Sequence, residues 1–166
     1  MDDWRQRLIE GDEEALAALI RSSRCVAVLG IKPETRSHKA AFYVAAALQR
    51  HGVEVVPVPV YYPEVVAILG QKVFRRVADV PRPIDIVDVF RRSHDVPPHV
   101  ADIIEARPRA VWLQSGIRND EAAEAFARKG ILVVQDRCLM VDWERYGADG
   151  SKRLSRPIED PKLSGL

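Results

Sequence analysis

The sequence predicts an α/β protein with a doubly wound, mainly parallel sheet of five strands and helices on both faces. Short apolar segments alternate along the chain with longer segments in which apolar residues recur at helical spacing. The short segments are rich in Val and Ile without polar alternation, which is typical of strands buried on both faces. Repeated β-α-β units with right-handed crossovers build such strands into a Rossmann-like sheet.

The expected elements follow from where these segments begin and end. Strands are expected at 25–29, 53–58, 84–90, 110–114 and 131–135. Helices are expected at 38–51, 97–107, 119–128 and 139–146. Gly52 suits the C-terminal end of the first of these helices, and Pro97 and Pro98 suit the first turn of the second. Residues 59–83 contain several prolines and are expected to be irregular, with short ordered pieces.

The chain divides into three parts by its pattern. Residues 1–23 are expected to form an N-terminal helical extension on the outside of the domain, because Leu16 and Leu19 lie at helical spacing. Residues 24–146 form the expected Rossmann-like domain. Residues 147–166 have mixed charge and no periodicity, which predicts a loosely ordered C-terminal tail or a segment packed on a partner subunit.

Composition and charge narrow the class of protein. With 166 residues, of which 47% are apolar and 30% charged, the chain resembles an ordinary globular domain with one core. The 25 basic and 24 acidic residues leave a net charge of +1, so no overall field favours nucleic acid or a membrane surface. Cys25 and Cys138 lack disulfide or metal-site spacing, and the N-terminus lacks an apolar signal segment. We therefore expect a cytoplasmic protein with reduced thiols.

The first strand and the turn after it form the leading candidate for a binding site. Gly30 ends the strand, Pro33 excludes both a central strand and a helix interior, and Ser37 opens the next helical pattern. A helix start after a glycine turn offers free N–H groups to an anion. The cations around this turn are Lys32, Arg36 and Lys39. A plain loop with solvated basic residues is the alternative.

The same stretch argues against a nicotinamide dinucleotide. Lys32 and Thr35 occupy positions where G-x-G-x-x-G requires glycine. The second strand also lacks a final acidic residue for a ribose hydroxyl. Other phosphate-bearing ligands stay open, because ligands of open parallel sheets bind at the carboxyl ends of the strands. Arg91 and Arg92 follow the third strand and add cations at that edge.

Catalytic and metal-ligand patterns are not found in the sequence. There is neither a P-loop nor a G-x-S-x-G elbow. His94 and His99 flank two prolines and are expected at the surface, and Cys138 has no neighbouring histidine, which favours a buried structural thiol. Asp85 and Asp88 have odd spacing in a strand, which places them on opposite faces. These observations favour a binding protein over an enzyme without deciding between them.

Five segments taken together resemble one family. They are VAVLGIKPETRS (26–37), ILGQKVFRRVADVP (68–81), IDIVDVFRR (84–92), VWLQSGIRNDEAA (111–123) and VQDRCLMV (134–141). Through them the sequence resembles the small stand-alone CoA-binding proteins, which are related to the CoA-binding domain of succinyl-CoA ligase alpha subunits. The chain departs from the family at Tyr61-Tyr62, where members often carry Asn, and at His38-Lys39, where Tyr is common.

The resemblance implies that coenzyme A or an acyl-CoA binds at the carboxyl ends of the strands. It assigns the phosphates to the loop 30–37, the adenine side to 58–59, the pantetheine or pyrophosphate region to 90–98, and the thiol arm to 114–117 and Cys138. The residues expected to bind the ligand are Gly30, Ile31, Lys32, Pro33, Arg36, Ser37, His38, Lys39, Val58, Pro59, Phe90, Arg91, Arg92, Val96, Gln114, Gly116, Ile117 and Cys138.

The resemblance favours a non-catalytic or regulatory role, because the ligase places its phosphorylated histidine in a second domain for which 166 residues leave no room. Two alternatives stay open. One is an acyl-CoA-using ligase or transferase component, with Cys138 or a histidine in the chemistry. The other is a degenerate nucleotide-fold module that binds proteins through its N-terminal helix or Tyr61 and Tyr62. A homodimer is also left open.

Overall fold

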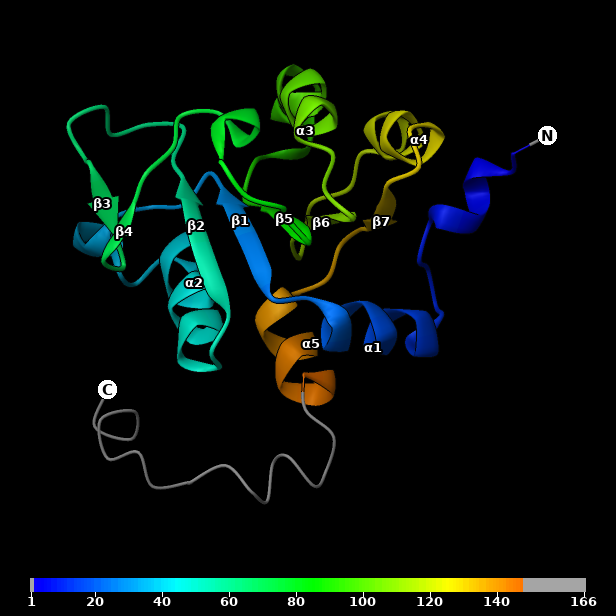
Figure 1. Ribbon diagram of the computed structural model, residues 1–166, viewed down its shortest axis with the longest axis horizontal. Helices are drawn as coiled ribbons and strands as arrows, with labels where there is room; N and C mark the ends of the chain where they lie inside the picture. Colours follow the sequence, from blue (N-terminus) through cyan, green and yellow to red (C-terminus); the bar gives the residue numbers. More distant parts are fainter. Residues whose placement is uncertain (1, 148–166) are drawn as a thin grey trace.

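Five parallel strands form the central sheet of the computed structural model, which describes residues 2–147 (Figure 1). Across the sheet they run in the order β2 (Glu54–Val58), β1 (Cys25–Leu29), β5 (Ile86–Val89), β6 (Ala110–Leu113) and β7 (Leu132–Val134). Every neighbouring pair is parallel. The doubly wound, Rossmann-like α/β fold expected from the sequence is confirmed.

Helices cover both faces of this sheet (Figure 1). One face carries α3 (Val100–Ala106) and α4 (Asp120–Arg128), and the other carries α1 (Glu13–Ser22), α2 (Ala40–Arg50) and α5 (Leu139–Tyr146). Because successive strand residues point to opposite faces, one strand supplies both cores. Val87 of β5 packs on the α3–α4 side, and Ile86 packs on the other side. Among the helices of residues 2–147, none is long and apolar enough to cross a membrane.

Short elements connect the strands and helices. The 3₁₀ helices of the described chain are η1 (Trp4–Arg7), η2 (Glu34–Arg36), η3 (Val77–Asp79), η4 (Ser93–Asp95) and η5 (Pro97–His99). An antiparallel hairpin of β3 (Ala67–Ile68) and β4 (Gln71–Lys72) lies within the segment expected to be irregular. Its turn residues Leu69 and Gly70 have φ of 54° and 73°, which fits the type I′ turn that tight hairpins prefer.

The helix α1 contributes apolar side chains to the core. Leu16, Leu19 and Ile20 are buried in the same cluster as Trp112 of β6. The side chain of Asp12 caps the helix by accepting a hydrogen bond from the N–H of its third residue at 3.0 Å. Helical spacing in the sequence reveals the apolar face of α1 but not the surface that this face covers.

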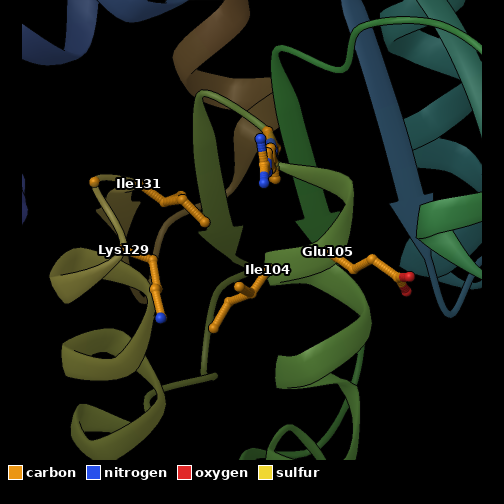
Figure 2. Close-up of a pocket in the computed structure, with 7 residues that line it drawn as sticks. Ile104, Glu105, Lys129 and Ile131 are labelled. Carbon is orange, nitrogen blue, oxygen red and sulfur yellow. The ribbon is translucent and has the colours of Figure 1, made fainter.

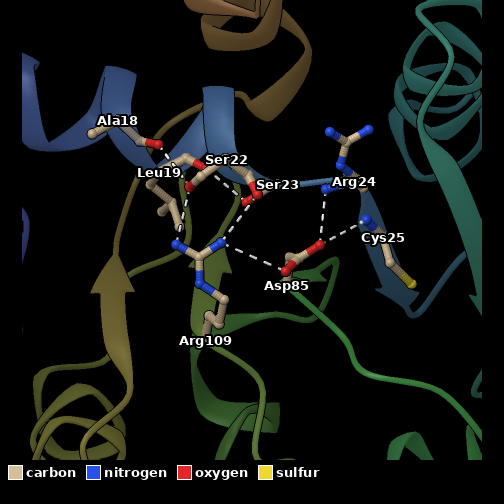
Figure 3. Close-up of polar contacts among 8 residues, drawn as sticks. All are labelled: Ala18, Leu19, Ser22, Ser23, Arg24, Cys25, Asp85 and Arg109. Carbon is tan, nitrogen blue, oxygen red and sulfur yellow. Dashed lines mark hydrogen bonds and ion pairs between the residues drawn. The ribbon is translucent and has the colours of Figure 1, made fainter.

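A polar network ties α1 to the amino ends of three strands (Figure 3). The Asp85 carboxylate accepts hydrogen bonds from the N–H groups of Arg24 at 2.8 Å and Cys25 at 3.0 Å. The Arg109 guanidinium lies 3.5 Å from Asp85 and donates to both the carbonyl oxygen and the hydroxyl of Ser22. Asp85 therefore has a structural role, and it lies at the edge of the sheet opposite the carboxyl ends of the strands.

The loop after β1 differs from the expectation at one site residue. The sequence predicted that Ser37 opens the helix after this loop. In the structure, α2 begins at Ala40 with Lys39 as its N-cap. Instead the N–H of Ser37 donates to the carbonyl oxygen of Glu34 at 3.1 Å and continues the turn of η2. Pro33 causes the shift, because it starts this 3₁₀ turn before the helix.

Two further expectations concern the ends of elements. The second expected helix starts as η5, and α3 itself begins only at Val100. The expected tail at 147–166 lies outside the described residues, apart from Gly147. The division of the chain into an extension, a domain and a tail stays a prediction.

Gly30 lets the segments after β1 and β5 touch. It has a φ of +86°, and a Cβ atom built there would lie 2.4 Å from the carbonyl oxygen of Phe90. The N–H of Gly30 donates to the carbonyl oxygen of Val58 at 2.9 Å. The N–H of Phe90 donates to the carbonyl oxygen of Leu29 at 2.8 Å. The ends of β2, β1 and β5 are therefore held together with no space for a side chain at Gly30.

We expect Gly30→Ala to destabilise the fold more than Gly52→Ala. Gly52 also has a φ of +86°, but an added Cβ would meet no atom within 4 Å. Its substitution therefore costs only the left-handed backbone, about 1–2 kcal/mol. Gly30→Ala adds a steric clash worth about 1–3 kcal/mol more. Urea unfolding of both variants measures the difference, and equal losses would show that the approach of Gly30 to Phe90 relaxes at no cost.

Candidate functional site

The order of the strands reverses at β1, because the chain continues from β1 to β2 on one side and later to β5 on the other. In open parallel sheets, ligands bind at the carboxyl ends of the strands at such a switch point. The loops 30–39, 59–66 and 90–96 leave the carboxyl ends of β1, β2 and β5 there. Contact between Gly30 and Phe90 brings the first and third of these loops together.

Cations from two of these loops lack an acidic partner. Arg36, Lys39 and Arg92 are exposed, and no carboxylate within residues 2–147 pairs with them. Lys32 is half-buried, and its Nζ lies 6.0 Å from the centre of the Tyr62 ring. These side chains give the edge a local positive potential, although the net charge of the whole chain is only +1.

Arg91 is held in place on several sides. Its side chain is only 15% exposed, and its guanidinium carbon lies 5.4 Å from the centre of the Tyr61 ring. Its Cδ lies 3.3 Å from where Gly30 would carry a Cβ. Its Nη2 is 3.9 Å from Asp95, and its buried Nε has no hydrogen-bond partner in the part of the chain that the structure describes. A fixed guanidinium with a free N–H suits an oxyanion such as phosphate.

The charge of Arg91 also acts on His99. Burial, followed by the Arg91 charge, lowers the pKa of His99, while Asp102 and Asp95 act in the opposite direction. The expectation that His94 lies at the surface is confirmed, whereas His99 is half-buried at the junction of η5 and α3. The lowered pKa keeps the His99 imidazole neutral at neutral pH, so it adds no cation to this edge.

The loops after β6 and β7 are bound to each other and to the helices that follow them. The Oε1 atom of Gln114 accepts the N–H of Leu139 at 2.9 Å and so caps α5. The N–H of Gly116 donates to the Asp136 carboxylate at 2.6 Å, and the side chain of Asn119 caps α4. The fold itself uses these groups of Gln114 and Gly116, which the resemblance assigned to the ligand.

Several other residues assigned by the resemblance lie in the core. Ile31, Val58 and Val96 are at most 1% exposed, and Pro33 and Pro59 are also buried. These are apolar residues at the ends of buried elements, and folding removes their side chains from solvent. The assignment of these five residues to the ligand stays a prediction, and their side chains pack within the protein.

The remaining assigned residues lie partly at the surface. His38 is exposed, and Phe90, Ile117 and Cys138 are half-buried. Phe90 and Cys138 pack against the core on the α1–α2–α5 side, and Ile117 packs against the other core. Cys138 and Cys25 are both free thiols, as expected, and burial raises the pKa of the Cys25 thiol to about 11. No group of three metal-ligating side chains occurs among residues 2–147.

Asp88 is a buried acid on the central strand. It is fully buried on β5, between Val28 of β1 and Trp112 of β6. Burial raises its pKa well above the usual range, because the charged form loses its hydration there. In the described chain, its two carboxylate oxygens and the Arg91 Nε are the buried side-chain atoms without a hydrogen-bond partner. The spacing of Asp85 and Asp88 predicted that they do not form a pair, and Asp85 instead binds the N–H groups of Arg24 and Cys25.

A depression of about 630 Å³ lies at the opposite edge of the sheet, beside the C-terminal ends of α3 and α4 (Figure 2). Its lining residues are Ile104, Glu105, Arg107, Pro108, Lys129, Gly130 and Ile131. Lys129 and Ile104 point into the space between the helices, whereas Glu105 points away and pairs with Arg76. None of the residues expected to bind a ligand lines this depression.

Comparison with known proteins identifies the family. The CoA binding domain family matches residues 24–144, and the chain belongs to this family. The match begins after α1, although α1 completes the core. The uncharacterized protein YneT of Bacillus subtilis (strain 168) is 34% identical over 125 residues, which cover 74% of this chain and 87% of YneT.

Two solved structures share the fold over most of the chain. The cell-free ID.343 protein from Thermus thermophilus matches with a TM-score of 0.74 and 35% identity, covering 81% of this chain and 98% of that one. A hypothetical protein from Pyrococcus horikoshii OT3 matches with a TM-score of 0.75 and 28% identity, covering 89% and 100%. Both similarities extend over nearly the whole length of the other protein.

We expect Asp88→Asn to change how stability depends on pH. The folded wild type keeps the Asp88 proton to a higher pH than the unfolded chain does, because its folded pKa is raised. Unfolding therefore releases a proton once the pH exceeds the ordinary Asp pKa. Relative to Asp88→Asn, the wild type should lose stability as the pH rises from that ordinary value to the folded pKa. Urea unfolding of both proteins across this pH range measures the effect, and parallel pH profiles would contradict it.

Proposed function

We propose that the protein binds coenzyme A or an acyl-CoA at the switch point, as a non-catalytic or regulatory CoA-binding protein. The observation that carries the proposal is Arg91, whose enclosed guanidinium lies against Gly30 and has an Nε without a hydrogen-bond partner within residues 2–147. A charged donor buried without a partner is costly unless a ligand completes it. Membership of the CoA binding domain family supports CoA as that ligand.

The phosphates of CoA match the cations of this site. CoA carries a diphosphate and a separate 3′-phosphate, and the planar guanidinium of Arg91 fits such an oxyanion in two-point contact. Arg36, Lys39 and Arg92 are exposed and unpaired within the described residues, so they can approach the remaining phosphate oxygens. The N-cap of α2 makes no side-chain hydrogen bond, which leaves N–H groups of its first turn free for an anion.

The uncharged arm of CoA suits half-buried side chains at the carboxyl ends of the strands. Phe90 and Cys138 pack against the same core, and Phe90 directly precedes Arg91. We place the arm beside these two side chains, where Cys138 acts as a contact rather than as a nucleophile. The proposal therefore assigns binding to the chain and no reaction. It keeps a small molecule as the partner, without nucleic acid or membrane, and the cytoplasm as the location.

We expect Arg91→Met to weaken CoA binding by about 10- to 100-fold, because hydrogen bonds to a charged group contribute about 1.5–3 kcal/mol. Arg91→Lys should recover only part of the loss, because an ammonium keeps the charge but lacks the planar fork. Arg50→Met is the matched control, since Arg50 is an exposed cation at the C-terminal end of α2. Calorimetric titration of the full chain with CoA, acetyl-CoA and NAD provides the measurement.

Two results would contradict the proposal. One is a wild-type chain that binds neither CoA nor acetyl-CoA up to millimolar concentration. The other is an Arg50→Met variant that loses as much affinity as Arg91→Met, which would mean that only the total charge matters. Thermal unfolding of each variant without ligand shows whether a lost affinity comes from a lost fold.

A further inference from the structure

Two tyrosines from the loop after β2 lie over cations from the neighbouring loops. The centre of the Tyr61 ring lies 5.4 Å from the guanidinium carbon of Arg91, and that of the Tyr62 ring lies 6.0 Å from Nζ of Lys32. Lys32 belongs to the loop after β1, and Arg91 belongs to the loop after β5. Both tyrosines therefore face the switch point from the β2 side and join aromatic surface to its cations.

Arg75 fixes the loop that carries these tyrosines. Its guanidinium donates hydrogen bonds to the carbonyl oxygens of Tyr61, Tyr62, Pro63 and Val65, at 3.2, 3.0, 3.3 and 2.6 Å. Tyr62 has a φ of 64°, a left-handed conformation that residues with a side chain adopt at a cost. The four hydrogen bonds of Arg75 stabilise this conformation. The backbone that carries the two tyrosines is thus positioned before a ligand arrives, which lowers the entropy lost on binding.

The ring of Tyr61 combines contact with a cation and exposure to solvent. Part of it covers Arg91, whose side chain is only 15% exposed, yet Tyr61 itself remains 61% exposed. An aromatic ring that lies on an arginine and stays open to solvent offers a surface on which a planar base can stack. The neighbouring strand β2 ends at Val58 and provides no carboxylate for a ribose hydroxyl. Stacking is therefore the means of nucleoside recognition that this side of the site provides.

We infer that Tyr61 is a specificity-determining residue that stacks on the adenine base of the ligand, while the phosphates reach the free N–H edge of Arg91. The inference rests on the proposed CoA function and adds to it the part of the ligand that Tyr61 recognises. Because the ring, rather than the hydroxyl, makes the contact, phenylalanine can replace Tyr61. An aliphatic side chain cannot.

The test compares three probes on the full chain: CoA, adenosine 3′,5′-bisphosphate, and inorganic diphosphate, which has no base. We expect Tyr61→Leu to weaken the binding of CoA and of the bisphosphate by about 5- to 150-fold. This range corresponds to the affinity lost when an aromatic side chain that stacks on a base is truncated. Diphosphate affinity should stay unchanged, and Tyr61→Phe should bind all three probes like the wild type. Tyr43→Leu is the matched control, because Tyr43 is a 44% exposed tyrosine on α2 with no cation over its ring within residues 2–147.

Three outcomes overturn the inference. Unchanged bisphosphate affinity in Tyr61→Leu removes Tyr61 from the site. An equal loss of diphosphate affinity means that Tyr61 acts only by holding Arg91. A loss in Tyr61→Phe equal to that in Tyr61→Leu means that the hydroxyl makes the contact.

The probes also separate this inference from the proposed function. A wild-type chain that binds the bisphosphate through Tyr61 but not CoA supports stacking and overturns the proposed CoA function. A wild-type chain that binds none of the probes overturns both.

Discussion

The close approach of Gly30 to Phe90 sets the geometry on which the candidate site depends. A Cβ at residue 30 would lie 2.4 Å from the Phe90 carbonyl oxygen, so the loops after β1 and β5 meet only because residue 30 has no side chain. Arg91 follows Phe90 directly, and the same contact places it against the turn at Gly30. Arg91 is consequently held with little freedom, and its Nε has no hydrogen-bond partner in the described part of the chain, so a phosphate binds a donor that is already oriented.

The carboxyl edge of the sheet divides into two halves with different chemistry. At β6 and β7, the polar groups are satisfied within the protein, as in the hydrogen bond from Gly116 to Asp136 and the capping of α5 by Gln114. The hydrogen bond from Asn119 to the carbonyl oxygen of Ser93 extends this network to the β5 loop. An anion gains little by competing for groups that are already paired. At β1, β2 and β5, by contrast, Arg36, Lys39 and Arg92 have no acidic partner within residues 2–147, and Arg91 keeps its Nε without a hydrogen bond there.

The fold could be predicted from the sequence because buried parallel strands require continuous apolar segments. The segment at 25–29 has no charged or amide side chain, and the segment at 110–114 has only Gln114 at its end, while Gly30 and Gly130 mark the end of one strand and the start of another. The position of the site at the strand ends follows from topology alone. The core role of α1 could not be predicted in this way, because helical spacing does not show which surface a helix covers.

Individual site residues were harder to predict, because their environment depends on contacts between distant segments. Ile31 and Val96 follow strands as loop residues do, yet packing between loops and helices buries them. The position of Asp88 in its strand indicated its face but not the lack of a partner there. The hydrogen bonds from Arg75 to the carbonyl oxygens of residues 61–65 could not be predicted from the sequence, because every acceptor is a backbone atom.

A crystal structure of the full chain with CoA tests the central claim most directly. The account predicts a phosphate oxygen of CoA within hydrogen-bond distance of the Arg91 Nε, where the loops after β1 and β5 meet. CoA bound instead in the depression beside Ile104 and Lys129, at the opposite edge of the sheet, would contradict it. So would CoA held by the loops after β6 and β7, with Arg91 left unpartnered.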